Sequence, residues 1–170
     1  MEFGPDFWNS PLVSSIAFVP RRTERTGGDN EGDFQVDGAT LGWRLYPRAD
    51  AASSPGAPVL LYAHANAETA ADVQLMAPFF HAAGFCAVLA WDYRGFGFST
   101  GQPSVGTLLP DMERVAATLP ALLEGKALAN RPLVMYGRSL GAACAVHIVS
   151  LAPVRRARQR RCPRGTAARA

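Results

Sequence analysis

Three short runs of apolar residues mark the middle of the chain, separated by segments with a helical period. The runs are "VLLYA" (59–63), "FCAVLA" (85–90) and "LVMY" (133–136). An unbroken apolar run of this length is typical of a strand that is buried on both faces of a parallel sheet. We therefore expect three buried parallel strands.

The segments that follow these runs carry helical patterns. Apolar residues recur near a period of 3.6 after the first run, and Gly84 follows them as a helix-ending glycine. After the second run we expect a helix that begins near Thr107, kinks at Pro120 and ends at Gly125. A third helix is expected over residues 139–151. This alternation predicts an α/β fold, a parallel sheet with helices on both faces.

The N-terminal part of the chain shows weaker patterns. Residues 34–47 hold an Asp37-Gly38 turn signal between two strand-like runs, which predicts a hairpin. A short apolar stretch at residues 16–19 is expected to form an early edge strand. Between them, residues 21–33 are polar and bear glycines, so we expect a loop.

Composition changes this picture only at the C-terminus. The length of 170 residues suffices for one domain, and the hydrophobic fraction of 48% is within the globular range. Residues 1–153 hold 14 acidic and 10 basic side chains, whereas residues 154–170 hold seven arginines and no acid. A frameshift, an unspliced intron or a misplaced gene end would produce such an abrupt change in composition, and we expect that one of these is its origin. The alternative is a genuine basic arm for nucleic acid or anionic lipid. No aromatic residues interleave the arginines, so we expect no nucleic-acid partner.

The cysteines and the N-terminus bear on the compartment. Cys86 and Cys144 lie in apolar runs and are expected to be buried. With Cys162 the chain has three cysteines. An odd cysteine count without a secretory signal favours a reducing compartment, so the expected localisation is cytoplasmic. No apolar run approaches the roughly 20 residues of a membrane span, so we expect no stable membrane insertion. No His, Cys or Asp cluster has metal-ligand spacing, so we expect no metal and no cofactor.

The third apolar run leads into "GRSLGAACA", where Ser139 stands between Gly137 and Gly141. A serine hydroxyl is a weak nucleophile unless it is exposed, aimed and next to a base. A sharp strand-to-helix turn aims it and brings the two backbones so close that both flanking positions must lack bulk. The helix N-terminus also points N–H groups at developing negative charge. The alternative is a turn in which the serine only caps a helix.

Two further stretches favour the catalytic interpretation. "HANAET" (64–69) follows the first apolar run, and "DYRGFGFSTGQPS" (92–104) follows the second. Together with Gly-x-Ser-x-Gly after the third run, they resemble the α/β-hydrolase superfamily, specifically the serine-aminopeptidase-like branch that includes protein depalmitoylases of the α/β-hydrolase-domain type. The resemblance covers about residues 34–151. It implies a serine hydrolase that cleaves an ester, thioester or amide acyl bond of a small acyl substrate or an acylated protein.

The resemblance implies a role for each matching residue. Ser139 matches the nucleophile, and the backbone N–H groups of Leu140 and Asn66 match the oxyanion hole. His64 matches a structural histidine that braces the turn after the first strand. Ala65 stands where the family has glycine, so it would strain this turn if the position needs a positive φ. The loop-shaping motif next to the site is matched by Asp92, Arg94, Gly95 and Gly97.

Ser139 has no evident base in this sequence. In this fold the acid and then the base follow the nucleophile along the chain. No Asp or Glu follows Ser139, and the single later histidine, His147, lies about 12 Å along the same helix. His81 does not match the position of the family's base either. We therefore expect a fold truncated after the serine turn and its helix, inactive as written, with residues 133–136 as an open apolar sheet edge.

This interpretation divides the chain into three parts. An N-terminal segment spans residues 1–33, a partial α/β-hydrolase domain spans residues 34–153, and an arginine-rich tail, disordered or out of frame, spans residues 154–170. The alternative function is that of a non-catalytic pseudoenzyme or interaction module that pairs through its exposed sheet edge.

Overall fold

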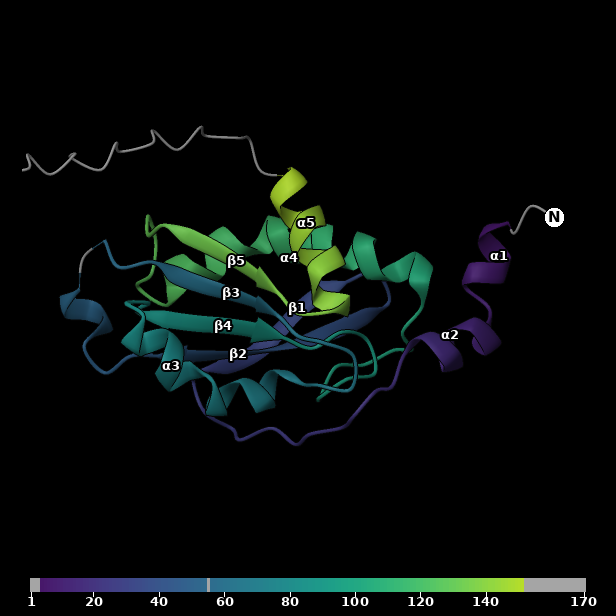
Figure 1. Cartoon of the computed structure of the whole chain (residues 1–170), viewed down its shortest axis with the longest axis horizontal. Helices are drawn as coiled ribbons and strands as arrows, with labels where there is room; N and C mark the ends of the chain where they lie inside the picture. The colour runs from purple at the N-terminus through teal and green to yellow at the C-terminus, as the bar shows by residue number, and fades with distance from the viewer. Residues whose placement is uncertain (1–3, 55, 152–170) are drawn as a thin grey trace, which may run out of the picture.

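The computed structural model describes residues 4–54 and 56–151, so the expected tail lies outside the described residues. Five strands form one sheet in the order β1-β2-β4-β3-β5 (Figure 1). The strands are β1 (Glu31–Val36), β2 (Ala39–Pro47), β3 (Val59–Ala63), β4 (Ala87–Trp91) and β5 (Leu133–Gly137). The helices are α1 (Pro5–Trp8), α2 (Pro11–Ala17), α3 (Ala77–Ala82), α4 (Val105–Gly125) and α5 (Leu140–Leu151), with 3-10 helices η1 (Ala51–Ser53) and η2 (Ala70–Leu75).

The sheet is mixed rather than wholly parallel. β3 pairs in parallel with β4 on one side and with β5 on the other, as the apolar runs predicted. β2 runs antiparallel to both β1 and β4. The predicted hairpin is confirmed, and Gly38 takes a φ of +70° in its turn. Its first strand begins at Glu31, so the loop expected over residues 21–33 is wrong for its last three residues. Residues 48–58 join the end of β2 to the start of β3. The two strands run in opposite directions, with β4 between them.

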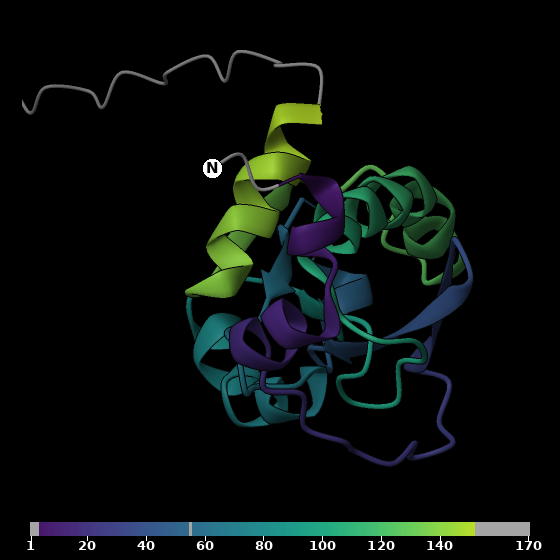
Figure 2. The same ribbon diagram turned by 90° about the vertical axis from the view of Figure 1, so that its right-hand side faces the viewer.

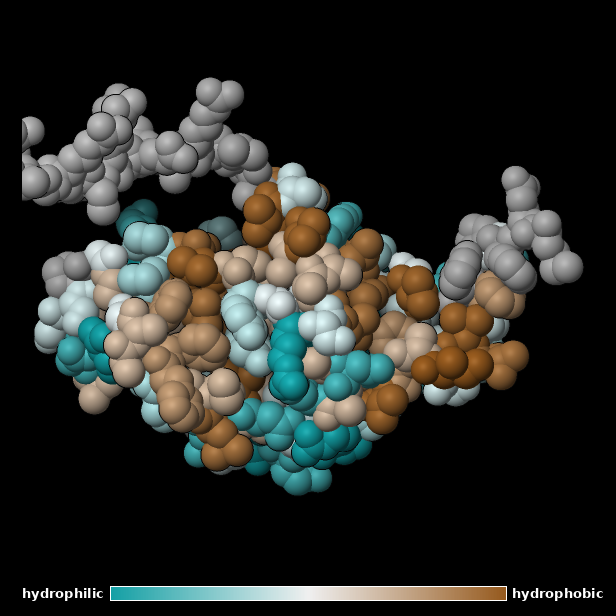
Figure 3. All heavy atoms as spheres, in the orientation of Figure 1, coloured by the Kyte–Doolittle hydropathy of each residue, from teal (hydrophilic) through white to brown (hydrophobic). Residues whose placement is uncertain are grey.

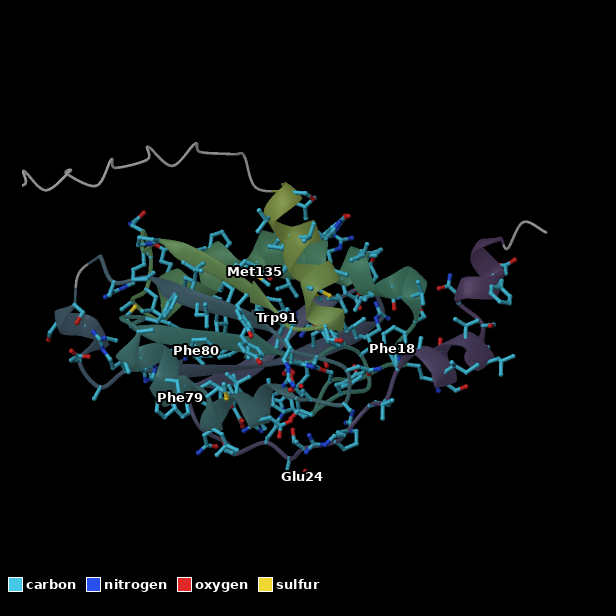
Figure 4. All side chains as sticks on the ribbon, in the orientation of Figure 1. Phe18, Glu24, Phe79, Phe80, Trp91 and Met135 are labelled. Carbon is cyan, nitrogen blue, oxygen red and sulfur yellow. The ribbon has the colours of Figure 1, made fainter. Side chains whose placement is uncertain are left out.

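Helices cover both faces of the sheet, as the α/β prediction requires (Figure 2). Successive strand side chains point to opposite faces, and this alternation gives two separate apolar clusters. The cluster under α4 and α5 includes Leu61, Leu89, Trp91, Met112, Val115, Cys144 and Ile148, with Met135 packed against it (Figure 4). The cluster under η2 and α3 includes Leu60, Tyr62, Ala70, Val73, Ala77 and Val88.

The edge strand expected at residues 16–19 is wrong. Residues up to Ala17 belong to α2, which begins after Ser10. The Ser10 hydroxyl accepts a hydrogen bond from the Val13 N–H (3.3 Å), and Pro11 occupies the first turn. A serine followed by proline is itself a helix-start signal. The serine side chain accepts from a free N–H of the first turn, and proline has no N–H that would need an acceptor there. This local signal outweighs the short apolar stretch behind it.

The later helices differ from the prediction at their ends. The helical segment after β3 is divided into η2 and α3, and Gly84 follows with a φ of +100°. α4 begins at Val105 rather than near Thr107, so Pro110 lies inside the helix. Pro120 also lies inside it, and the helix continues unbroken for 21 residues. Packing of α4 against the sheet therefore outweighs the loss of backbone hydrogen bonds at both prolines.

β5 was expected as a buried strand that also forms an open edge, and only the open edge is correct. It pairs with β3 on one side alone. Leu133, Val134 and Tyr136 are 46%, 42% and 41% exposed. Figure 3 shows hydrophobic surface over the region where β5 and α5 lie in Figure 1. An apolar edge strand of this kind is a template for pairing with another chain.

Cys86 and Cys144 are both buried, as expected. Burial raises the pKa of the Cys144 thiol from 9.0 to about 11. The folded state therefore holds this proton more tightly than the unfolded chain, and stability falls as the pH rises from about 9 to about 11. Replacing Cys144 with alanine should remove this part of the pH dependence. Urea unfolding of both proteins at about pH 8 and about pH 10.5 measures it, and parallel losses would contradict the assignment.

Candidate active site

Ser139 lies in the tight turn that joins β5 to α5, and the residue is exposed. Its φ of +51° falls in the left-handed region, which costs a non-glycine residue roughly 1–2 kcal/mol. The Ala142 N–H donates to the Ser139 carbonyl oxygen (2.8 Å), so the turn runs directly into the helix. A strained residue of this kind persists only where its surroundings determine its backbone.

Gly137 and Gly141 provide those surroundings. A Cβ atom on Gly137 would overlap the carbonyl group of Gly141. A Cβ atom on Gly141 would overlap the carbonyl group of Ala63, at the end of β3. The Arg138 N–H also donates to the Ala63 carbonyl oxygen (3.1 Å). The serine turn is therefore stacked directly on the end of the neighbouring strand, with no room for a side chain at either glycine.

The turn after β3 leaves a single backbone donor free among the described residues. Each backbone N–H from Ala65 to Ala70 donates to an oxygen, except that of Asn66. The acceptors are Glu68 Oε2 for Ala65 (2.9 Å), Asn66 Oδ1 for Ala67 (3.2 Å), the Ala65 carbonyl for Glu68 (3.1 Å), Asp72 Oδ2 for Thr69 (2.8 Å) and Asp92 Oδ1 for Ala70 (2.7 Å).

A second free donor lies at the start of α5. Leu140 is the first residue of this helix, so its N–H has no intrahelical acceptor. No other described residue accepts a hydrogen bond from it. Because β3 and β5 are adjacent and parallel, the amides of Leu140 and Asn66 both follow strand ends at the same edge of the sheet. Both free donors therefore lie at the edge of the sheet that also carries the exposed residue Ser139.

The strain expected at Ala65 is absent. The residues of this turn with a positive φ include Ala67, at +63°, and not Ala65. Alanine at position 65 therefore occupies an ordinary backbone conformation. The side chain of Asn66 ties the turn to the N-terminal segment, because its Oδ1 accepts from Val19 N–H (2.9 Å) and its Nδ2 donates to the Ala17 carbonyl (3.0 Å).

His64 is fully buried behind this turn. Its Nδ1 lies 2.8 Å from the Ala65 carbonyl oxygen, and its Nε2 lies 3.4 Å from Asp92 Oδ1, longer than an ordinary hydrogen bond. The Tyr93 hydroxyl donates to the His64 carbonyl (2.8 Å), and the two rings are 4.3 Å apart. The histidine thus joins the turn after β3 to the loop after β4, and no hydrogen bond joins it to Ser139.

The loop after β4 is shaped around a buried carboxylate. Asp92 is fully buried, and a Cβ atom on Gly97 would overlap its carboxylate. Gly97 and Gly95 take φ values of +51° and +75°. Arg94 is directed toward α4, where Nε and Nη2 each lie 2.7 Å from the Asp111 carboxylate, and these hydrogen bonds raise the pKa of Arg94.

No histidine of the described residues is hydrogen-bonded to Ser139. The Nε2 of His81 lies 3.1 Å from the Tyr46 carbonyl oxygen. The Nε2 of His147 lies 3.1 Å from Glu113 Oε1, on the neighbouring helix α4. Both contacts hold the rings at other parts of the fold, so neither ring is positioned as a base.

Sequence reasoning missed two charged residues at the site. Glu68 and Arg138 form an ion pair that connects the turn after β3 to the residue before Ser139. Glu68 is part of the "HANAET" stretch and Arg138 is the variable position of Gly-x-Ser-x-Gly, but the two are 70 residues apart. No local pattern predicts such a pair.

Two structural features are absent from residues 4–54 and 56–151. This part of the chain contains no group of three or more His, Cys, Asp or Glu residues placed to hold a metal ion. None of its helices has both the length and the apolar character needed to cross a lipid bilayer.

Known proteins resemble this chain over most of its length. The family model described as serine aminopeptidase, S33 matches residues 54–159. Protein bem46 of Schizosaccharomyces pombe is 33% identical over 84% of this chain and 49% of its own length. The α/β hydrolase domain-containing protein aho-3 of Caenorhabditis elegans is 33% identical over 54% of this chain and 26% of its own. The chain thus spans half or less of these relatives.

Solved structures share the fold. An esterase of Pyrococcus furiosus matches with a TM-score of 0.53 and 19% identity over 79% of this chain and 51% of its own. A monoglyceride lipase of Saccharomyces cerevisiae matches with a TM-score of 0.52 and 20% identity over 69% of this chain and 37% of its own. With the family match over more than half of its residues, the chain belongs to the serine aminopeptidase S33 family of α/β-hydrolases.

Proposed function

We propose that this chain carries the nucleophile and oxyanion half of a serine hydrolase site that acts on an acyl group in ester, thioester or amide linkage. One observation carries the proposal. An exposed serine in a left-handed turn lies at the same sheet edge as two backbone N–H groups that have no acceptor among the described residues.

In the proposed reaction, Ser139 Oγ attacks the carbonyl carbon and its proton passes to a base. The carbonyl oxygen becomes an oxyanion that accepts hydrogen bonds from the N–H groups of Leu140 and Asn66. The bond to the leaving group then breaks, and the base returns the proton to that group. Water releases the acyl group by the same steps. The proposal assigns no acid and no base among the described residues, because His147 pairs with Glu113 and His81 lies at the Tyr46 carbonyl.

A second candidate is a non-catalytic interaction module. The observations that favour it are the lack of a histidine at Ser139 in the described residues and the exposed apolar strand β5. Such a module needs no reactivity at Ser139, so a chemical test of this side chain separates the two candidates.

The test supplies the base from solution. Imidazole is added to the 170-residue chain with p-nitrophenyl butyrate. Ester hydrolysis is followed for the wild type, for Ser139→Ala and for the matched surface variant Ser150→Ala, on the helix α5 that follows the serine turn. We expect imidazole to accelerate hydrolysis by the wild type and by Ser150→Ala. An oxyanion hole without its triad still accelerates the reaction by about 10³-fold or more over water. The hydrolysis rate with protein and imidazole should therefore exceed the rate with imidazole alone. Equal rates for Ser139→Ala and the wild type would favour the interaction module.

A further inference from the structure

We propose that Glu68 and Arg138 are positioning residues that hold the Asn66 amide in place relative to Ser139. The inference rests on the proposed function and extends it to two side chains that lie within the matched stretches but to which the resemblance assigns no role. Neither residue is assigned contact with the substrate. Their role is to fix the distance between the two halves of the oxyanion site.

The Glu68 carboxylate contacts both halves at once. Its Oε2 accepts the Ala65 N–H (2.9 Å), within the turn that carries Asn66. Its Oε1 pairs with the Nη1 of Arg138, the residue directly before Ser139. The Glu68 side chain is 23% exposed and that of Arg138 is 59% exposed, so the carboxylate is the more enclosed partner. A single side chain therefore connects the turn after β3 to the serine turn.

The first contact decides which amide is free. Because Glu68 accepts the Ala65 N–H, this donor is removed from the site and the turn closes on itself. The Asn66 N–H is left as the free donor of residues 65–70. Without the carboxylate, the Ala65 amide competes for the oxyanion and the turn loses the bond that sets its shape.

The second contact, the ion pair with Arg138, neutralises the negative charge of Glu68 near the site. Glu68 is two residues from Asn66, and its carboxylate without a cation partner would repel an oxyanion that develops at the Asn66 amide. The guanidinium of Arg138 neutralises this carboxylate in the folded chain. This predicts an outcome that a purely structural ion pair does not share. Loss of Arg138 should be harmful mainly because the Glu68 charge remains, so removing that charge should restore reactivity.

The readout is the second-order rate constant for labelling of Ser139 by a fluorophosphonate, with imidazole present. In this reaction the Oγ–P bond forms, the P–F bond breaks, fluoride leaves and imidazole takes the proton, while the phosphonyl oxygen occupies the oxyanion site. Displacement of a catalytic group by about 1 Å costs about 10²-fold, so we expect a loss of about 100-fold for Glu68→Ala.

The conservative variants separate geometry from charge. Glu68→Gln keeps an acceptor for the Ala65 N–H, and we expect a loss of about threefold. Arg138→Gln leaves an unpaired carboxylate, and we expect a loss of about tenfold. The double variant Glu68→Gln with Arg138→Gln should return to the rate of Glu68→Gln alone. Asp37→Asn is the matched control, because it breaks the exposed ion pair with Arg114 away from the site, and its rate should stay unchanged.

The outcomes distinguish this inference from the proposed function. Absence of label on Ser139 in the wild type would overturn both. Normal labelling of the wild type together with an unchanged rate for Glu68→Ala would overturn the inference alone. If Glu68→Ala fails to fold, the Arg138→Gln and double variants decide, and additive losses in the double variant would contradict the charge argument.

Discussion

Replacing Gly141 with alanine is expected to lower the free energy of unfolding by at least about 3 kcal/mol, a large share of the stability of a domain this size. The added Cβ would overlap the carbonyl groups of Ala63 and His64. Both obstacles are backbone atoms at the end of β3, so no side-chain rotation relieves the overlap. α5 would have to move away from the sheet, taking Leu140 with it.

Gly125→Ala is the matched control for this prediction. Gly125 is the last residue of α4, and a Cβ atom there meets nothing within 4 Å. Alanine has the higher helix propensity, so this change should be neutral or slightly stabilising. Urea unfolding measures both variants. A Gly141→Ala protein as stable as Gly125→Ala would mean that the serine turn is not stacked on β3.

Replacing Asp92 with alanine is expected to lower the free energy of unfolding by about 3 kcal/mol or more. The change removes a fully buried carboxylate and leaves its buried polar neighbours without their partner. The Ala70 N–H, which donates to Asp92 Oδ1 (2.7 Å), loses its acceptor. His64 Nε2 loses the facing carboxylate oxygen. The carboxylate space over Gly97 also becomes a cavity. The turn after β3 and the loop after β4 would both loosen.

The control for this prediction is an acidic residue in an exposed pair. Asp37→Ala removes the pair with Arg114, whose side chains are 82% and 58% exposed, and should cost less than about 1 kcal/mol. Urea unfolding of both variants gives the comparison. Equal losses for Asp92→Ala and Asp37→Ala would show that the buried carboxylate does not join the two loops.

The sequence predicted those features that local chemistry determines. The serine turn follows from Gly137, Ser139 and Gly141, because a tight strand-to-helix turn constrains residues only two positions away. The strands β3 and β4 follow from apolar runs, because both faces of each strand are covered. The same reasoning failed for β5, which also has an unbroken apolar run but lies at the sheet edge. Strand order depends on contacts between distant segments, which a pattern along one segment does not contain.

Distant contacts also explain what was missed around the candidate site. Glu68 and Arg138 meet only because β3 and β5 are neighbours. Asn66 is hydrogen-bonded to Ala17 and Val19, which are 49 and 47 residues away along the chain, so no local pattern could show this attachment. The strain expected at Ala65 was taken from a family glycine, whereas the left-handed position in this turn is Ala67.

A crystal structure of the 170-residue chain after reaction with a fluorophosphonate tests the serine turn and both amide donors together. We expect a phosphorus atom bonded to Ser139 Oγ. Its phosphonyl oxygen should lie within about 2.7–3.1 Å of the backbone nitrogens of both Leu140 and Asn66. A phosphonyl group on another residue, or an oxygen turned away from both amides, would contradict the assignment of residues 137–141 as the nucleophile turn of a hydrolase.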